Sequence, residues 1–298
     1  MEARLWESKF VRLCRFDDDR RGRDRIGVVL DDAVADVSEI LDALPAARYP
    51  YPPGDALIAA LPDLRPEIER LAAAATPAPL SSLRLKAPVA NPGKIVAAPI
   101  NYQSHIDLDL VGSDIAHAHI ISHISKAGLF LKAASSLVGP AEGVTIAFPD
   151  RRNDHEIELV AVIGRTARNV PRERALEHVA GYCIGLDMTV RGTEDRSFRK
   201  SADSYSVAGP WLVTADEIGD PGALEMRLAV NGRQRQKANT RSLVYDLPKL
   251  IEYASSVYTL YPGDLLFTGT PDGVGPVKAG DVIECAIERI GSMSVAVR

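Results

Sequence analysis

The sequence predicts an α+β protein in which a small N-terminal unit precedes a larger one. Three observations support this class. In the first 75 residues, segments that alternate like strands are followed by short helical segments. The stretch 76–93 is rich in Ala, Pro and Ser, a composition typical of a linker. The residues after it contain strand patterns separated by turns, and 298 residues are enough for one large domain or a main domain plus a small one.

The N-terminal unit is predicted to begin with a β-hairpin. Residues 10–16 alternate between apolar and polar, and residues 26–30 form a second strand pattern. Between them, residues 17–25 carry four acids and four bases, so their charges cancel and a solvated loop explains the run. A third strand at 33–37 leads to a helix that begins near Ser38, a residue type that caps helix N-termini.

Two short helices at 55–61 and 66–75 complete this unit. We therefore predict a small α+β domain over residues 1–80, a linker over 81–93 and a second domain over 94–298.

The second domain is predicted to combine short apolar strands with two helices. Pro171 at a first turn and Gly181 after the last turn bound one helix. Asp246 caps the other, whose apolar residues recur at i, i+3, i+4 and i+7. The helices are expected at 171–180 and 247–257, and the strands at 94–99, 130–132, 154–164, 182–191 and 265–268.

Acidic residues interrupt two of these strands. Glu156 and Glu158 share one face of their strand, where carboxylates roughly 7 Å apart repel by about 2–3 kcal/mol at an effective dielectric of ~20. A hard divalent cation such as Mg²⁺ or Mn²⁺ would relieve this repulsion, and the alternative is that both glutamates face water. Asp187 lies in an apolar run, where it needs a cation or a strong donor, unless it is a core aspartate bonded to backbone.

Four histidines are candidates for chemistry. His105 follows a predicted strand, where a general base can act, although a surface histidine explains it as well. His117, His119 and His123 are spaced like zinc ligands, but only His119 and His123 fall at i,i+4. Because two ligands do not complete a zinc site, we predict that this cluster does not bind metal.

A glycine-rich loop over residues 268–275 follows the last predicted strand. It lacks the lysine of a phosphate-binding P-loop and the helix that should follow, so it does not predict a nucleotide site. Its backbone N–H groups can instead hold a carboxylate.

Composition excludes several classes of function. The net charge of −5 argues against nucleic acid or an anionic membrane as the main partner. No apolar run approaches the ~20 residues of a transmembrane helix, and the N-terminus lacks the apolar segment of a signal peptide. The three cysteines are widely spaced and odd in number, which favours reduced thiols in a cytoplasmic protein.

Short motifs follow one another in order through the second domain. They are Asn101-Tyr102-x-x-His105, Phe130-Leu131-Lys132, His155-Glu156-Ile157-Glu158-Leu159, Leu186-Asp187-Met188-Thr189-x-Arg191, Lys200-Ser201, Gly209-Pro210-Trp211, Val230-Asn231-Gly232, Pro262-Gly263-Asp264 and Thr268-Gly269-Thr270-Pro271. Their order and spacing resemble the fumarylacetoacetate hydrolase family from about residue 92 to the C-terminus, whereas the first ninety residues are only loosely similar.

The resemblance implies a fold, a metal and an assembly. The fold is a mixed β-sheet roll flanked by helices over 94–298, usually in a homodimer. The metal is one Mg²⁺ or Mn²⁺, which Glu156, Glu158 and Asp187 would bind.

Further residues gain roles from the resemblance. Lys132, Arg191, Lys200 and Thr270 match positions that hold the substrate's carboxylate and oxygens, and His105 matches a catalytic histidine on a lid. We expect Lys200 to act catalytically, by stabilising negative charge on the attacked oxygen.

Two departures from the family pattern bear on the mechanism. Many relatives carry a glutamate three residues after the catalytic histidine, and here that position is Leu108. Asp107 and Asp109 flank it, and Asp109 is the candidate substitute. Glu194 stands where some relatives have a glutamine near the substrate.

The implied activity is metal-dependent cleavage of a C–C bond in a 2,4-dioxo acid, as in the catabolism of aromatic compounds. Water activated by His105 would attack the distal carbonyl and release a carboxylic acid and pyruvate or a related 2-oxo acid. The same chemistry suits oxaloacetate decarboxylation, or isomerisation or hydration of an unsaturated 2-oxo acid. A catalytically silent metal-binding protein is the alternative of another class, although such a protein should have lost a carboxylate or His105.

Overall fold

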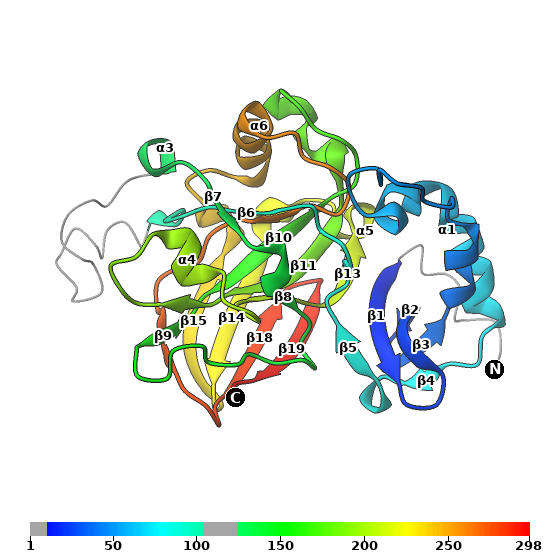
Figure 1. Ribbon diagram of the computed structural model, residues 1–298, viewed down its shortest axis with the longest axis horizontal. Coiled ribbons are helices and arrows are strands. Elements are labelled where there is room, and N and C mark those ends of the chain that lie inside the picture. The colour runs from blue at the N-terminus through cyan, green and yellow to red at the C-terminus, as the bar shows by residue number, and fades with distance from the viewer. Residues whose placement is uncertain (1–10, 104–123) are drawn as a thin grey trace.

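The computed structural model describes residues 11–103 and 124–298, in which a mixed β-sheet core is flanked by few helices (Figure 1). Most strand pairs are antiparallel, but two pairs are parallel, so the predicted α+β class with a mixed sheet is confirmed. Within the described ranges, no helix is long and apolar enough to cross a membrane.

The N-terminal strands form an antiparallel series. β1 (Arg12–Asp18) pairs with β2 (Gly22–Leu30), and β2 pairs with β3 (Ala33–Asp36). Strand β2 begins inside the charged segment that was predicted as a loop, although its first three residues are exposed. On its other side β1 pairs with β13 (Ser206–Thr214), so one sheet continues across the predicted linker. The proposed domain limits therefore stay a prediction.

One long helix replaces two predicted short ones. Helix α1 (Ala56–Ala74) is capped by the side chain of Asp55, which accepts two backbone N–H bonds. Pro62 and Pro66 lie inside the helix and remove two donors from it. Buried apolar residues on both sides of the prolines pack the helix against the N-terminal strands, and this packing outweighs the lost hydrogen bonds.

Two other predicted α-helices are short 3-10 helices, η1 (Ser38–Ala43) and η4 (Arg172–His178). Ser38 does not cap the first, because its hydroxyl bonds back to the preceding strands. Gly181 does not end the second but lies inside β11 (Val179–Asp187). A Cβ on Gly181 would lie 2.2 Å from a carbonyl oxygen of β13, so glycine is required for close strand approach.

The largest sheet contains the buried centre of the fold. Every residue of β10 (Ile157–Ile163) is buried, and this strand pairs with β11 on one side and with β16 (Leu265–Phe267) on the other. Strand β11 pairs in turn with β13. The remaining strands of this sheet are β4 (Ala78–Pro79), β5 (Arg84–Lys86), β6 (Ile95–Ala97), β7 (Phe130–Lys132) and β8 (Leu137–Val138).

Two smaller sheets complete the roll, and the larger of them packs against β10, β11 and β13 to close the main core. Their strands are β12 (Thr189–Val190), β9 (Asn153–His155) and β17 (Gly275–Val277) in one, and β15 (Arg233–Asn239), β14 (Glu225–Val230), β18 (Val282–Ile287) and β19 (Gly291–Ala296) in the other.

The helices lie outside the sheets (Figure 1). Asp246 caps α6 as predicted, by accepting from the backbone N–H of Lys249. The α-helices after α1 are α3 (Ile124–Ala127), α4 (Arg196–Lys200), α5 (Ala215–Ile218) and α6 (Leu247–Val257), and the remaining 3-10 helices are η2 (Leu80–Ser82), η3 (Ala134–Ser136), η5 (Pro221–Ala223) and η6 (Thr240–Ser242).

Candidate metal centre

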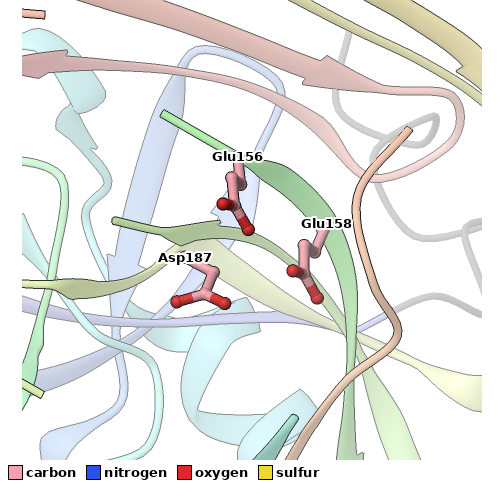
Figure 2. A group of neighbouring side chains, drawn as sticks. All are labelled: Glu156, Glu158 and Asp187. Atoms are coloured by element: carbon pink, nitrogen blue, oxygen red, sulfur yellow. The ribbon is translucent and has the colours of Figure 1, made fainter. Parts of the chain in front are cut away.

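Three carboxylates meet at one end of the β10–β11 pair. Glu156 precedes β10, Glu158 is its second residue and Asp187 is the last residue of β11. The antiparallel register sets Ile157 opposite Leu186, and the N–H of Asp187 donates to the carbonyl of Glu156 at 2.9 Å. The three side chains therefore point into the same space, and each offers an oxygen within 4.8 Å of the others (Figure 2).

The carboxylates are buried, which strengthens their mutual repulsion. Glu158 and Asp187 are each 1% exposed and Glu156 is 7% exposed. At 4.8 Å and an effective dielectric of about 20, two of these charges repel by about 3.5 kcal/mol. Burial, together with the charges of Asp187 and Glu156, raises the pKa of Glu158 well above its usual value. Three oxygen donors at this spacing are the ligand type that hard divalent cations prefer.

Two lysines partly neutralise this cluster. Lys200 of α4 donates from Nζ to Glu156 Oε2 and to Asp187 Oδ2, both at 2.7 Å. Lys132 of β7 donates to the other oxygen of Asp187 and to the carbonyl of Tyr205. Burial lowers the pKa of Lys132, whereas the pKa of Lys200 is raised because Asp187 and Glu156 outweigh its burial.

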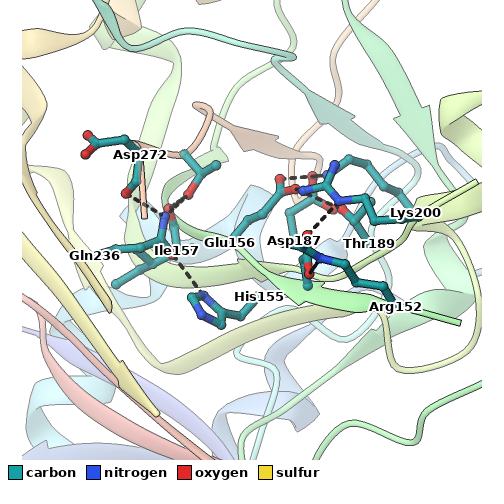
Figure 3. Close-up of polar contacts among 12 residues, drawn as sticks. Arg152, His155, Glu156, Ile157, Asp187, Thr189, Lys200, Gln236 and Asp272 are labelled. Atoms are coloured by element: carbon teal, nitrogen blue, oxygen red, sulfur yellow. Dashed lines mark hydrogen bonds and ion pairs between the residues drawn. The ribbon is translucent and has the colours of Figure 1, made fainter. Parts of the chain in front are cut away.

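Arginines and a threonine fix the neighbouring acids. Asp154 is fully buried and accepts from Arg191 Nε at 2.6 Å and from Arg152 Nε at 2.8 Å. Arg191 also lies 3.5 Å from Glu156, and Thr189 donates from Oγ1 to Glu156 at 3.0 Å. In Figure 3, Thr189, Arg152 and Lys200 lie together beside Glu156 and Asp187. Glu156 is therefore held by several donors.

The glycine-rich loop supplies a backbone donor to the cluster. The N–H of Gly269 donates to Glu158 Oε2 at 2.6 Å, so the loop does hold a carboxylate, one from the chain itself. Gly269 has a φ of +97°, and a Cβ there would lie 2.8 Å from the Cβ of Asn101. The neighbouring Thr270 donates from Oγ1 to the carbonyl of Ile157 at 2.8 Å, which ties the loop to β10.

Gln236 is a site residue that sequence reasoning missed. Its Oε1 accepts from the N–H of Ile157 at 3.2 Å and lies 3.1 Å from His155 Nδ1. Its Nε2 donates to Thr270 Oγ1 and to the carbonyl of Pro271, both at 2.9 Å. Figure 3 shows Gln236 close to His155 and Ile157. The side chain thereby joins the carboxylate strand to the glycine-rich loop. It lies in a polar, mostly exposed strand, so no sequence pattern distinguishes it from its neighbours.

The described part of the chain brings together seven of the residues predicted for this site. They are Glu156, Glu158, Asp187, Lys132, Lys200, Arg191 and Thr270. The predicted base His105 and its possible partners Asp107 and Asp109 lie outside the described residues, as do Leu108 and the cluster of His117, His119 and His123.

The sequence is similar to a known protein family and to individual proteins of other organisms. A family model described as fumarylacetoacetate (FAA) hydrolase C-terminal matches residues 94–298. The chain is 56% identical over 290 residues to a maleylpyruvate hydrolase of Aquipseudomonas alcaligenes, covering 97% of this chain and 99% of the relative. It is 38% identical over 227 residues to a mitochondrial oxaloacetate tautomerase of Xenopus laevis, covering 72% of this chain and 68% of the relative.

Solved structures agree with this match. The structure of maleylpyruvate hydrolase from Sphingobium sp. SYK-6 in complex with manganese(II) ion and pyruvate is similar to this chain with a TM-score of 0.80. The two are 42% identical, and the match covers 96% of this chain and 98% of the other. A 5-carboxymethyl-2-hydroxymuconate delta-isomerase from Mycobacterium smegmatis gives a TM-score of 0.68 at 30% identity, with the same coverage.

Proposed function

The chain belongs to the fumarylacetoacetate hydrolase family, and on this premise we propose that it hydrolyses acylpyruvates. It is a divalent-metal-dependent enzyme that cleaves a C–C bond in a 2,4-dioxo acid, and the products are pyruvate or a related 2-oxo acid and a carboxylic acid. The maleylpyruvate hydrolases that it resembles over nearly their whole length support this reaction class.

The main structural support for this proposal is the buried carboxylate cluster. Glu156, Glu158 and Asp187 would hold one Mg²⁺, or else Mn²⁺, because their oxygens converge and carboxylate oxygens are the ligands that hard divalent cations prefer. The raised pKa of Glu158 supports this fit, since a carboxyl group that resists ionisation beside two others gains most from a bound cation. The manganese(II) bound to the Sphingobium enzyme supports a divalent metal.

When bound, the cation supplies Lewis-acid polarisation of the 2-oxo acid end of the substrate. Cationic side chains of the protein would stabilise negative charge and orient the substrate. Lys200 is fixed between Glu156 and Asp187 and would supply positive charge where the attacked carbonyl oxygen becomes negative. Arg191 is partly exposed and can orient the substrate. Lys132 is completely buried against Asp187, which supports orientation of the site through that carboxylate.

Two further residues complete the proposed machinery. His105 would take a proton from the water that attacks the distal carbonyl, with Asp109 or Asp107 as its acidic partner. Thr270 would bind a substrate oxygen from the glycine-rich loop, which Gln236 and Ile157 hold in place.

We further propose that the protein is a cytoplasmic homodimer that acts in the catabolism of aromatic compounds. The three cysteines, which are buried and free, support a reducing compartment. We keep the division into a small domain over 1–80, a linker over 81–93 and a metal-binding catalytic domain over 94–298 as part of this proposal.

The deciding experiment is a substrate screen with added Mg²⁺ or Mn²⁺. Acylpyruvates should be cleaved with release of pyruvate, and chelation should abolish the reaction reversibly. Oxaloacetate and an unsaturated 2-oxo diacid belong in the same screen, because the similarity to an oxaloacetate tautomerase favours a second candidate activity. Turnover of oxaloacetate alone would replace the hydrolase proposal with a tautomerase or decarboxylase.

A further inference from the structure

Segment 191–194 connects Arg191 to the helix that carries Lys200. It begins where the two-residue strand β12 ends, and it leads into α4, whose last residue is Lys200. Helix α4 has only five residues, and a helix this short is not stable on its own. The positions of both cations therefore depend on the contacts that hold this segment.

The guanidinium of Arg151 binds the start of segment 191–194. The β9–β12 pairing ends just before Arg191. Beyond it, the carbonyl of Arg191 accepts from Arg151 Nε at 3.1 Å and from Arg151 Nη2 at 2.8 Å. The side chain of Arg191 lies beside Asp154 and Glu156. Arg151 thus fixes the backbone of Arg191 at the point where strand pairing stops.

The same guanidinium binds the end of the segment through Glu194. Arg151 Nη1 donates to Glu194 Oε1 at 2.9 Å and Nη2 donates to Oε2 at 2.8 Å, the paired geometry in which guanidinium and carboxylate bind strongly. The carbonyl of Glu194 accepts from Arg199 Nε of α4 at 2.8 Å. The next residue, Asp195, caps α4 by accepting a backbone N–H at 2.8 Å. Glu194 therefore links Arg151 to the beginning of this short helix.

Arg151 and Glu194 lie directly against the backbone of the segment. A Cβ on Gly192 would lie 1.8 Å from Arg151 Nη2 and 2.3 Å from Glu194 Oε2, so a glycine is needed for this close approach. Arg151 also lies 5.1 Å from the ring centroid of Phe148. Exposed ion pairs usually contribute little to stability. This pair differs from them, because four N–H bonds and an aromatic ring fix the position of one guanidinium.

These contacts give a physical reason for a carboxylate at position 194. Some relatives have a glutamine there near the substrate, whereas the side chain of Glu194 is bound to Arg151. A glutamine would keep one oxygen acceptor, but its amide N–H group would face an N–H donor of Arg151. Only a carboxylate accepts both bonds of the guanidinium.

We propose that Arg151 and Glu194 are positioning residues for the two cations that act on the substrate. By holding segment 191–194 at both ends, they orient Arg191 toward the substrate and keep Lys200 at the carboxylate centre. The inference rests on the proposed acylpyruvate hydrolysis and adds to it the residues that place its cationic groups. Because a displacement of about 1 Å at such groups can lower a rate by about 100-fold, loss of the pair should be visible in kinetics.

Kinetics and calorimetry of single and double variants test this role. Arg151→Met, Arg151→Lys, Glu194→Gln and the double variant Arg151→Met/Glu194→Gln are compared with wild type by kcat and KM for an acylpyruvate at saturating Mg²⁺. Binding of Mg²⁺ and of pyruvate, the proposed product, is measured separately by calorimetry. Arg70→Met and Glu67→Gln are matched controls, because Arg70 binds Glu67 on α1 through a similar pair of hydrogen bonds.

The expected losses follow from the contacts of each side chain. Arg151→Met should lower kcat/KM by about 100-fold and weaken pyruvate binding. Arg151→Lys should recover little, since one ammonium does not reproduce the planar fork of the guanidinium. Glu194→Gln should lose about 10-fold, because the bonds to the Arg191 carbonyl remain. The double variant should be no worse than Arg151→Met, since both side chains act through one interaction. Mg²⁺ should still bind, and both controls should behave like wild type.

Other results would overturn the positioning role. Wild-type kcat/KM in Arg151→Met, or losses that multiply in the double variant, would contradict it while leaving the hydrolase activity standing. Loss of Mg²⁺ binding together with activity would mean that Arg151 supports the fold and does not orient the cations. Should Arg151→Met fail to fold, wild-type kcat/KM in Glu194→Gln would contradict the role. A wild type that cleaves no acylpyruvate would overturn the proposed function, and pyruvate binding by the variants would still decide the role of Arg151.

Discussion

Replacement of Glu158 by glutamine separates metal binding from folding. The substitution keeps the shape of the side chain and removes one of three buried carboxylates whose oxygens lie within 4.8 Å of one another. At an effective dielectric of about 20, each repulsion that it removes is about 3.5 kcal/mol, partly offset by Lys132 and Lys200. Without metal, we therefore expect Glu158→Gln to be at least as stable as wild type at pH 8.

The pH dependence of stability has a definite sign. Burial, Asp187 and Glu156 raise the pKa of Glu158 above the unfolded value of 4.5, so the folded chain holds this proton more tightly than the unfolded chain. Stability of the metal-free protein should consequently fall as pH rises above 4.5, until pH passes the raised pKa. The glutamine variant lacks this contribution, and its melting temperature should depend less on pH above 4.5.

With added metal, wild type should become more stable than Glu158→Gln. A cation at 100 times its dissociation constant stabilises wild type by about 2.7 kcal/mol, or roughly 5 °C in melting temperature for a chain of this size. The variant should lose most of this shift and about 100-fold or more of its activity, because Lewis-acid assistance is worth several kcal/mol. Calorimetry with and without Mg²⁺ and an acylpyruvate assay measure both.

Glu217→Gln is the matched control for Glu158→Gln. Glu217 is also a buried glutamate with a raised pKa, which burial causes, but it lies on α5 beside Arg12. Its replacement should leave the metal-induced shift and the activity unchanged. If Glu158→Gln kept the wild-type metal shift, or retained full activity in the presence of chelator, the assignment of the metal to this cluster would be wrong.

Three other predictions follow from separate parts of the chain. His105→Ala should lower acylpyruvate hydrolysis by about 100-fold or more and any oxaloacetate decarboxylation far less, and equal losses in kcat/KM would argue against a general base. Gln236→Leu leaves buried donors and acceptors of the loop and β10 unpaired, so urea unfolding should show a free energy of unfolding that is lower by about 1–3 kcal/mol. An unchanged midpoint of unfolding would contradict the bridging role of Gln236. Burial raises the pKa of Cys14 and of Cys183 to about 12, and it raises the pKa of Cys285 further. Native protein at pH 8 should therefore resist alkylation, whereas unfolded protein should react at all three thiols. Rapid labelling of the native protein would refute this.

The acidic residues of the site could be predicted because they stand out from the local strand pattern. Strand alternation puts Glu156 and Glu158 on one face, and Asp187 is conspicuous in an apolar run. Their meeting could not be derived from spacing, because it depends on the β10–β11 register, and 28 residues lie between Glu158 and Asp187. The grouping of the three acids was predicted only from the resemblance to a family.

Other features could not be predicted from the sequence because they depend on tertiary packing. A helix over 171–180 fits Pro171 and Gly181, yet the chain enters β11 at Val179, because the apolar run that follows can be buried on both faces only as a central strand. Gln236 gave no signal either, since its importance lies in four partners from two distant segments. Hydrogen-bond networks of this kind are defined only once the sheets have packed.

The proposed metal ligands pair with lysines, and this pairing links the proposed metal to the role proposed for Lys200. In the metal-free arrangement burial lowers the pKa of Lys200, but Asp187 and Glu156 outweigh it, so the ammonium is charged and largely neutralised by its neighbours. An ammonium compensated in this way exerts little field on a substrate oxygen. On the proposed mechanism, carboxylates that also shared their charge with a divalent cation would compensate the ammonium less, and the positive potential of Lys200 would then reach the site where negative charge develops. The proposed metal would therefore do more than polarise the 2-oxo acid: without it Lys200 would remain an ion-pair partner, and with it the same side chain would act as an electrostatic catalyst.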